Sequence, residues 1–566
     1  MDFQRTLLIG GLAIVGYLMI LQWDKDYNQV PTTTQQQEQH QTVPSSEDAP
    51  QLTQAKQGTA DDIPKLDTVS DAPTDSASVS EQVVTVTTDT LAVEIDTKGG
   101  NIVKVSLLKY PVKLPDDEEP NPAPFTLLER SSARTFIAQS GLIGPDGTDS
   151  KGKPTYQTAQ TSYQLNGGDT LNVDLSLIDK KGVKVIKRYT FTKGTYEVKV
   201  SYVVDNTSST TWQANLYAQL KRDNTQDPSN SASSMGMSTY LGAAVRGKEE
   251  RYVKLPFDEF DEEKFSADVT GGYAAILQHY FVSSWIPNQE QLNTFYTRKA
   301  GNNNIVGFKN QNNPLKLAAG EKGEISATLY IGPKDQKRLA ELADGLELTI
   351  DYGVLWFVAQ PLFWLLTFIH SLIPNWGWSI ILLTVLVKAA FYPLSAASYR
   401  SMANMRRLSP KLQEMRERFG DDRQKMSQAM MEMYKKEKIN PLGGCLPILV
   451  QMPVFIALYW VLLESVELRQ APWLGWITDL SVKDPYFILP LIMGASMFVQ
   501  QLLNPTPPDP MQAKVMKMMP IIFTVFFLFF PAGLVLYWVV NNLLSIAQQW
   551  MITRQIEGQA AAKSTK

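Results

Sequence analysis

The sequence predicts a multi-domain protein in which a large β-sandwich precedes an α-helical, polytopic membrane core of six transmembrane helices. Two observations lead to this fold class. The first half of the 566-residue chain is polar and alternates apolar with polar side chains over many short stretches, whereas the second half contains several long apolar runs. The mean hydropathy of −0.16 averages these halves and describes neither.

Composition excludes several classes of protein. The chain has one cysteine, Cys445, and three scattered histidines, so no disulfide framework or four-ligand zinc site is expected. The motifs of nucleotide hydrolysis, serine-type acyl transfer and zinc proteolysis are missing from the sequence. The net charge of −4 argues against a nucleic-acid-binding protein as a whole. We therefore expect no metal, no cofactor, no small-molecule substrate and no enzymatic activity.

The N-terminus is predicted to be a membrane anchor followed by a tether. Residues 6–21 are apolar and are followed by Trp23, an interfacial residue type, without the small residues of a cleavage site. We assign residues 1–26 to an uncleaved transmembrane anchor. Residues 27–81 are rich in Gln, Thr, Ser, Pro and Asp, a composition that buries too little apolar surface to fold, and they are assigned to a flexible tether.

Residues 82–335 are predicted to form the β-sandwich. Apolar and polar residues alternate with a period of two from Val83 onwards, and Gly99-Gly100 provides a turn. Similar stretches recur at residues 171–178, 184–205, 271–286 and 323–333. A sandwich hosts many functions, so this fold alone identifies none.

Residues 336–375 are predicted to contain amphipathic and interfacial helices. The stretch 334–346 has the pattern of a short amphipathic helix. The apolar stretch 354–373 is interrupted by Gln360-Pro361 and followed by Pro374-Asn375, which favours a helix on the outer membrane surface over a crossing.

The remaining crossings are predicted from apolar length. Residues 376–395 form the second transmembrane helix, and residues 442–552 contain the third to the sixth. The last apolar stretch is too long for one crossing, and we divide it into two helices at the Phe-Pro-Ala-Gly turn of residues 530–533.

Charge sets the predicted orientation. The loop 400–438 is rich in lysine and arginine, whereas residues 464–485 contain only Arg469 and Lys483. Basic loops mark the cytoplasmic side, so we expect both termini, including the tail 553–566, in the cytoplasm and the β-sandwich outside.

The basic loop, residues 396–441, is predicted to be a cytoplasmic helical hairpin with a methionine stripe. Its methionines recur at helical spacing on both sides of a break at residues 420–422. The stripe either joins the two helices or presents an adaptable apolar surface to varied peptides. The methionines concerned are Met402, Met405, Met415, Met426, Met430 and Met433.

Lys388 is the unusual residue of the second crossing. A lysine at the centre of a membrane helix costs about 2.5–3.5 kcal/mol on insertion scales and usually faces a protein interior or a wet cavity. The alternative is that its long side chain extends to the head groups from a position near the helix end.

Four strings carry a resemblance to a known family. They are NPLGGCLPILVQMPVFIALY (440–459), VELRQAP (466–472), DPMQAKVMKMMP (509–520) and FPAGLVLYW (530–538). Over residues 351–552 the chain closely resembles the YidC membrane protein insertases, relatives of the Oxa and Alb insertases of mitochondria and chloroplasts. The anchor, tether and β-sandwich resemble the Gram-negative version, with the large domain in the periplasm of an inner-membrane protein.

The resemblance implies a hydrophilic groove with a cation from the second crossing, which attracts acidic tails of newly made membrane proteins. Lys388 matches the position where most of the family has arginine; a lysine keeps the positive charge but lacks arginine's planar, bidentate fork, which argues for electrostatic attraction and against any role that requires that geometry. Further polar groove candidates are Thr384, Gln451, Gln500, Trp538, Asn541 and Asn542. For each of these, a simple hydrogen bond between helices is the alternative. Apolar candidates for a surface along which a substrate helix slides are Met452, Pro453, Phe455, Phe523 and Phe527.

The expected partners are nascent inner-membrane proteins, the lipid bilayer, the ribosome and the Sec translocon, beside which the protein acts when it does not act alone. Two other functions stay open. A transporter would show inverted repeats and broken helices, which are not evident. A carbohydrate enzyme built on the sandwich would require clustered carboxylates or histidines.

Overall fold

The computed structural model describes residues 82–564, with gaps at 116–118, 230–238, 262–263, 437–445 and 505–509. Between 409 and 422 it describes only residues 411, 414, 415 and 418. The expected anchor and tether, residues 1–81, and the expected hairpin break at 420–422 lie outside the described residues.

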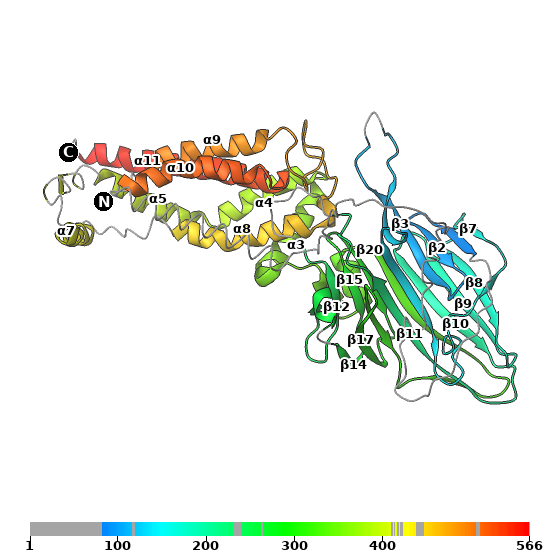
Figure 1. Ribbon diagram of the computed structural model, residues 1–566. Helices are drawn as coiled ribbons and strands as arrows, with labels where there is room; N and C mark the ends of the chain where they lie inside the picture. Colours follow the sequence, from blue (N-terminus) through cyan, green and yellow to red (C-terminus); the bar gives the residue numbers. More distant parts are fainter. Residues whose placement is uncertain are drawn as a thin grey trace, which may run out of the picture. The chain divides into compact units, whose positions relative to one another are not determined.

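Two large sheets form the β-sandwich that the alternating pattern predicts (Figure 1). The first sheet has 11 strands in the order β14-β17-β18-β11-β5-β4-β3-β2-β1-β7, with β19 paired to β11. Its strands are β1 (Val83–Thr87), β2 (Leu91–Asp96), β3 (Asn101–Pro111), β4 (Pro124–Arg130), β5 (Thr135–Ile143), β7 (Ser162–Gln164), β11 (Trp212–Arg222), β14 (Ser266–Thr270), β17 (Leu292–Ala300), β18 (Asn303–Lys309) and β19 (Leu315–Leu317).

The second sheet has nine strands in the order β13-β12-β15-β16-β20-β10-β9-β8-β6. Its strands are β6 (Gln157–Thr158), β8 (Thr170–Ile178), β9 (Lys184–Thr192), β10 (Glu197–Asp205), β12 (Gly242–Val245), β13 (Val253–Leu255), β15 (Ala274–Leu277), β16 (Phe281–Ile286) and β20 (Lys322–Pro333).

Local sequence explains these strands. In β9 the buried residues alternate with partly exposed ones, as the period-two pattern requires, and the strand pairs antiparallel with β10. Gly99 and Gly100, between β2 and β3, have φ angles of +80° and +58°, a conformation that L side chains rarely adopt. The predicted turn is therefore present, and its two glycines are required by the backbone.

The core between the sheets is aromatic and aliphatic, with Trp212 and Trp285 each 1% exposed. One member of this core comes from outside the sandwich: Val466, which follows helix α8 (Leu446–Glu464), packs among the sandwich residues. Arg469 and Gln470 donate hydrogen bonds to the carbonyl oxygen of Pro111 at 2.7 and 3.0 Å. The segment after α8 is thus bound to the sandwich.

The predicted short amphipathic helix is α2 (Gln336–Leu342). Asp335 caps it by accepting a hydrogen bond from the backbone N–H of Arg338, and Leu339 is fully buried. The short 3-10 helices of this region and of the sandwich are η2 (Phe257–Asp261), η3 (Leu346–Thr349) and η4 (Gly353–Leu355), and η6 (Val466–Leu468) follows α8.

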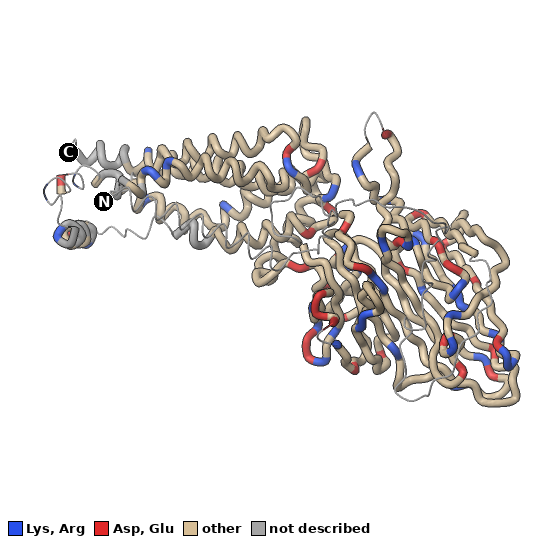
Figure 2. The backbone as a smooth tube through the Cα atoms, in the orientation of Figure 1, with Lys and Arg blue, Asp and Glu red and all other residues tan. Residues whose placement is uncertain are grey.

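The second half of the chain is helical. Its other helices are α3 (Trp356–Leu372), α4 (Trp376–Ala390), α5 (Tyr392–Arg407), α7 (Arg423–Lys436), α9 (Ile488–Leu503), α10 (Pro510–Phe527) and α11 (Ala532–Ser564). Helix α11 packs against α9, α4, α5 and α8, and α10 packs against α9 (Figure 1). Lysines, arginines and acidic residues are sparse along α3, α4, α8 and α9 and frequent in the sandwich (Figure 2).

Two helix breaks shape this region. The break between α10 and α11 falls at residues 528–531, where the Phe-Pro-Ala-Gly turn was expected, but α11 continues to Ser564, through the segment expected to be a tail. The segment predicted as the second transmembrane helix, residues 376–395, contains a break: α4 ends at Ala390 and α5 starts at Tyr392, with a bend of 68° between their axes. Pro393 lies in the first turn of α5, where its missing N–H has no intrahelical partner to lose, so its position suits a helix that starts after a break.

Length and composition identify few complete spans among the described residues. The stretch Gly353–Leu372 is long and apolar enough to cross a membrane, and α4 with α5 passes the same test as a bent pair. The stretch Gly353–Leu372 contains the α3 segment that the sequence favoured as lying on the surface. The number of six crossings is not established by these helices and stays a prediction.

Candidate functional site

Lys388 lies in the last turn of α4, directly before the bend, and it is 4% exposed. Its ammonium donates a hydrogen bond to the hydroxyl oxygen of Ser545 on α11, with 2.7 Å between Nζ and Oγ. Among the described residues, no Asp or Glu pairs with it. The side chain is therefore held inside the helical region by a neutral partner, in contrast to a lysine that extends to the head groups.

Ser545 links α4 to α11. Its hydroxyl accepts from Lys388 of α4 at 2.7 Å and donates to the backbone carbonyl of Asn541 in its own helix at 2.7 Å. The side chain of Asn541 in turn accepts a 3.0 Å hydrogen bond from the Gln451 amide of α8. We call these four residues the Lys388 network.

A second set of hydrogen bonds joins α11 to α9. The amide of Asn542 donates to the Ser496 hydroxyl at 3.0 Å, and the amide of Gln549 donates to the Leu503 carbonyl and the Asn504 side chain. These are bonds between packed helices, the alternative that the sequence left open for Asn542.

The remaining polar candidates differ in their surroundings. Thr384 is 1% exposed and donates to the carbonyl oxygen of Ile380 in its own helix. The indole N–H of Trp538 is buried without a partner among the described residues, and its ring packs edge-on against Phe455 with 4.4 Å between centroids. Gln500 is half-buried on α9, and no described hydrogen bond links it to the Lys388 network.

The apolar candidates differ in how exposed they are. Met452 and Pro453 are exposed on α8, and Phe455 and Phe523 are partly buried. Phe527 is 2% exposed and lies in the packed core of the helical region. A surface along which another helix slides has to be accessible. Because Phe527 is buried, it cannot form part of such a surface and can only pack behind it.

The methionine hairpin is described in part. Helices α5 and α7 are present on its two sides, and Met402 packs beside Ala396, Tyr399 and Ile552. Met415 and Met433 are partly buried, while the side chains of Met405, Met426 and Met430 lie outside the described residues. Met402 therefore contacts α11, which neither interpretation of the stripe anticipated.

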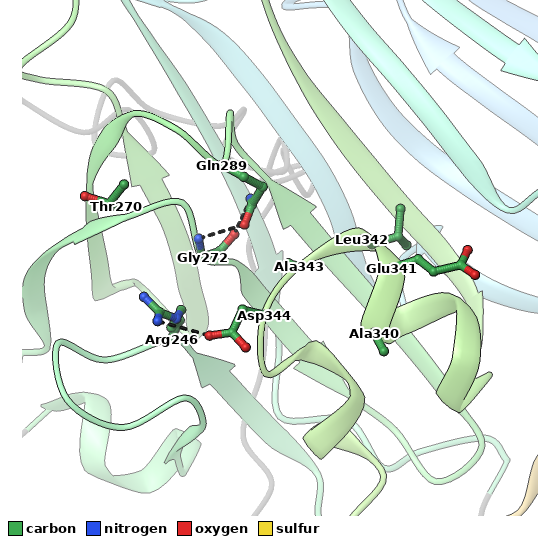
Figure 3. Close-up of a pocket in the computed structure, with 9 residues that line it drawn as sticks. All are labelled: Arg246, Thr270, Gly272, Gln289, Ala340, Glu341, Leu342, Ala343 and Asp344. Atoms are coloured by element: carbon green, nitrogen blue, oxygen red, sulfur yellow. Dashed lines mark hydrogen bonds and ion pairs between the residues drawn. The ribbon is translucent and has the colours of Figure 1, made fainter.

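A pocket formed by described residues of the sandwich and α2 can be compared with an enzyme site. It has a volume of about 390 Å³ and lies beside α2 (Figure 3). Its Asp344 accepts a 3.1 Å hydrogen bond from Arg246, and Glu341 points away from that pair. The described residues hold no group of three or more His, Cys, Asp or Glu suited to a metal ion. Paired carboxylates, the requirement for a glycosidase, are not brought together in this pocket.

The sequence analysis missed Ser545, Ser496 and Gln549. A signal was available, because the polar residues of 541–549 stand at positions 541, 542, 545, 548 and 549. Spacings of three and four place them along one side of a helix. This polar ridge lies within an apolar segment whose length alone indicates a crossing, so length does not reveal it.

Comparison with known proteins gives consistent family matches. Residues 368–560 match the family model described as 60Kd inner membrane protein, and residues 83–365 match the model of the YidC periplasmic domain. The proteins named membrane protein insertase YidC from Pseudomonas aeruginosa and Stutzerimonas stutzeri are each 56% identical to this chain, covering 100% and 99% of it and 100% of their own lengths.

A solved structure described as an active YidC insertase with its first transmembrane domain resolved aligns with 83% of this chain and 92% of its own. Its TM-score is 0.36 and its sequence identity is 19%. The full-length relatives are named as insertases, which are not enzymes, and this confirms the expected absence of enzymatic activity. The chain belongs to the YidC family of membrane protein insertases, inner-membrane proteins with a periplasmic domain, which here is the β-sandwich.

Proposed function

We propose that this chain inserts newly made proteins into the inner membrane and helps them fold, and that the Lys388 ammonium attracts acidic residues of their tails. The observation that carries this proposal is the burial of Lys388 at 4% exposure with a hydroxyl, and no carboxylate among the described residues, as its partner. Burying a cation inside a membrane protein costs free energy, and a residue that does so generally has a functional role.

Electrostatics supports an acidic ligand. The Coulomb attraction between opposite charges a few ångströms apart is far stronger in a partly desolvated site than in water. A substrate carboxylate approaching Lys388 would add a charged acceptor beside the neutral Ser545 hydroxyl, and charge-assisted hydrogen bonds are about twice as strong as neutral ones. The cation therefore lowers the energy of an acidic tail partway across the membrane.

Lysine is suited to a transient contact. Its ammonium has three rotatable donors and makes no demand for the planar, two-pronged geometry of arginine. The resulting attraction depends on charge and distance, which suits tails of different sequence. In the proposal, a hydrophilic groove around the Lys388 network admits the tail from the cytoplasm.

An apolar surface beside this network would receive the substrate's membrane segment. Met452 and Pro453 are exposed on α8, the helix whose Gln451 belongs to the network. Transfer of an apolar helix of about 20 residues into lipid is favourable, so no nucleotide is required. We propose that the segment moves along this part of α8 while its tail is held near Lys388.

The proposed topology has six crossings, two cytoplasmic termini and α3 at the outer surface. Helix α3 exposes aromatic side chains, the class that accumulates at membrane interfaces, namely Trp356, Phe357, Trp364 and Phe368. The exposed lysines of α7, including Lys435 and Lys436, suit contact with ribosomal RNA. Cooperation with the Sec translocon is proposed from the family alone.

A depletion-and-rescue assay tests the function. Cells depleted of their own insertase would receive Lys388→Arg, Lys388→Ala or Lys388→Glu variants at matched protein levels, and insertion of a small substrate with an acidic outer tail would be scored. Arginine is expected to restore insertion, whereas alanine and glutamate are expected to fail. Equal rescue by all three would mean that Lys388 has a structural role only.

A further inference from the structure

We propose that Ser545 is a positioning residue for the Lys388 ammonium and that its neutrality is required for acidic substrates. This inference rests on the proposed function and adds a residue to it. The hydroxyl oxygen of Ser545 lies 2.7 Å from Nζ of Lys388, and both side chains are buried, at 3% and 4% exposure.

The hydroxyl is itself fixed in direction. Ser545 donates its one proton to the Asn541 carbonyl at 2.7 Å, so its lone pairs face away from that bond and accept from Lys388. Asn541 is held by the Gln451 amide at 3.0 Å. The direction of the Ser545 hydroxyl is therefore set by the backbone of α11, and Gln451 joins the same turn of α11 to α8.

Ser545 also holds the cation beside the bend between α4 and α5. Lys388 lies in the last turn of α4, directly before the 68° bend. The Ser545 hydroxyl, on α11, therefore fixes the ammonium at the end of α4 that faces the bend.

The acceptor that bonds Lys388, the Ser545 hydroxyl, is neutral, and this neutrality has a consequence for the charge of the site. A hydroxyl satisfies one of the three N–H groups of the ammonium and leaves its positive charge uncompensated. A carboxylate in the same place would neutralise that charge permanently, because breaking a buried ion pair is strongly unfavourable. The site holds Lys388 in place and keeps its charge available to an incoming carboxylate.

The test uses the full chain at matched levels, with two single-spanning probes whose outer tails differ only by Asp or Asn. Ser545→Asp is compared with Ser545→Asn, which has nearly the same shape and no charge. The expected result is that Ser545→Asp lowers insertion of the Asp probe about tenfold relative to Ser545→Asn, the factor that corresponds to one charged hydrogen bond. The Asn probe is expected to change by less than about twofold between the two variants.

Two further variants guard against misfolding as the explanation. Ser545→Thr, which restores the hydroxyl, is expected to recover the preference for the Asp probe that Ser545→Ala loses. Ser371→Ala serves as a control, because the Ser371 hydroxyl bonds only the Phe368 carbonyl of its own helix α3. Equal effects of Ser545→Asp and Ser545→Asn on both probes would overturn the inference.

Lys388→Met, measured with the same probes, separates the two proposals. If it lowers insertion of the Asp probe while Ser545→Asp does not, the role of Ser545 is wrong and the proposed function stands. If Lys388→Met leaves the ratio of the two probes unchanged, the proposed function itself fails.

Discussion

Lys334 and Glu464 form a buried ion pair, with 3.1 Å between Nζ and Oε2 and side-chain exposures of 3% and 2%. Lys334 directly follows β20, the last strand of the sandwich, and Glu464 is the last residue of α8. The pair therefore joins the sandwich to a helix that also carries Gln451 of the Lys388 network. Together with Val466 in the sandwich core, it makes the end of α8 part of both regions.

Removing one partner of this pair is expected to be costly. Glu464→Gln leaves the Lys334 ammonium buried without its counter-charge, which typically destabilises by about 3–5 kcal/mol. Thermal unfolding of the full chain in detergent measures the effect. The double variant Lys334→Met/Glu464→Met, which removes both charges, is expected to recover much of the loss, and an equally unstable double variant would contradict this explanation.

We expect the folding stability to depend on pH through His279, which lies at the same junction. One ring nitrogen, Nε2, lies 2.8 Å from the Leu463 carbonyl oxygen, and burial lowers the pKa of the imidazole below its usual value. The unfolded chain, with a histidine pKa of about 6.5, then binds more protons than the folded chain as the pH falls below that value. Stability is expected to be complete above about pH 6.5 and to decrease below it.

Denaturant unfolding between about pH 5 and 8 checks this expectation. His279→Gln keeps an N–H donor for the Leu463 carbonyl and cannot be protonated in this range, so it should flatten the profile. If the variant keeps the full pH dependence of the parent, another group is responsible.

Gly494 is predicted to be required for the packing of α9 on α10. A Cβ atom at this position would stand 1.9 Å from Oγ1 of Thr524, so Gly494→Ala forces the helices apart. Overpacking of this kind typically costs about 1–3 kcal/mol. Unfolding in detergent should show the loss of stability. The double variant Gly494→Ala/Thr524→Ala, which removes the clashing oxygen, should restore part of it. If the double variant is no more stable than Gly494→Ala, the clash with Thr524 is not the cause.

The basic face of α7 is predicted to bind ribosomes through charge. Replacing Lys435 and Lys436, both exposed, with glutamine should weaken ribosome binding and reduce its dependence on salt. Sedimentation of the full chain in detergent with ribosomes at several salt concentrations measures both effects. Substituting Lys184 and Lys193 of the sandwich, which are also exposed, provides the matched control, and equal losses from both pairs would indicate a nonspecific charge effect.

Local patterns in the sequence predicted much of this fold. Alternation identified the stretches that contain β1–β3, β8–β10, β15, β16 and β20, Gly99-Gly100 marked a turn that needs positive φ angles, and the Phe-Pro-Ala-Gly stretch located the break before α11. Each of these features depends on neighbouring residues and on backbone conformations that few residue types adopt.

Contacts between distant residues were not predictable in the same way. Nothing near Val466 indicates that it packs in a sandwich more than 130 residues away, and Lys334 and Glu464 carry no local sign of their pairing. Lys388 was identified because a charge in an apolar run is conspicuous on its own. Its partner Ser545 was missed because a serine in a membrane helix is ordinary until its neighbour is known.

The most direct test of the central claim is a double-mutant cycle between Lys388 and a substrate carboxylate. Full-length protein in proteoliposomes, with and without Lys388→Met, would insert probes with Asp-bearing and Asn-bearing tails. We predict that Lys388→Met slows the Asp probe about tenfold or more and the Asn probe by less than about twofold, a coupling of about 1 kcal/mol or more. Equal slowing of both probes would show that Lys388 supports the structure and does not attract acidic tails.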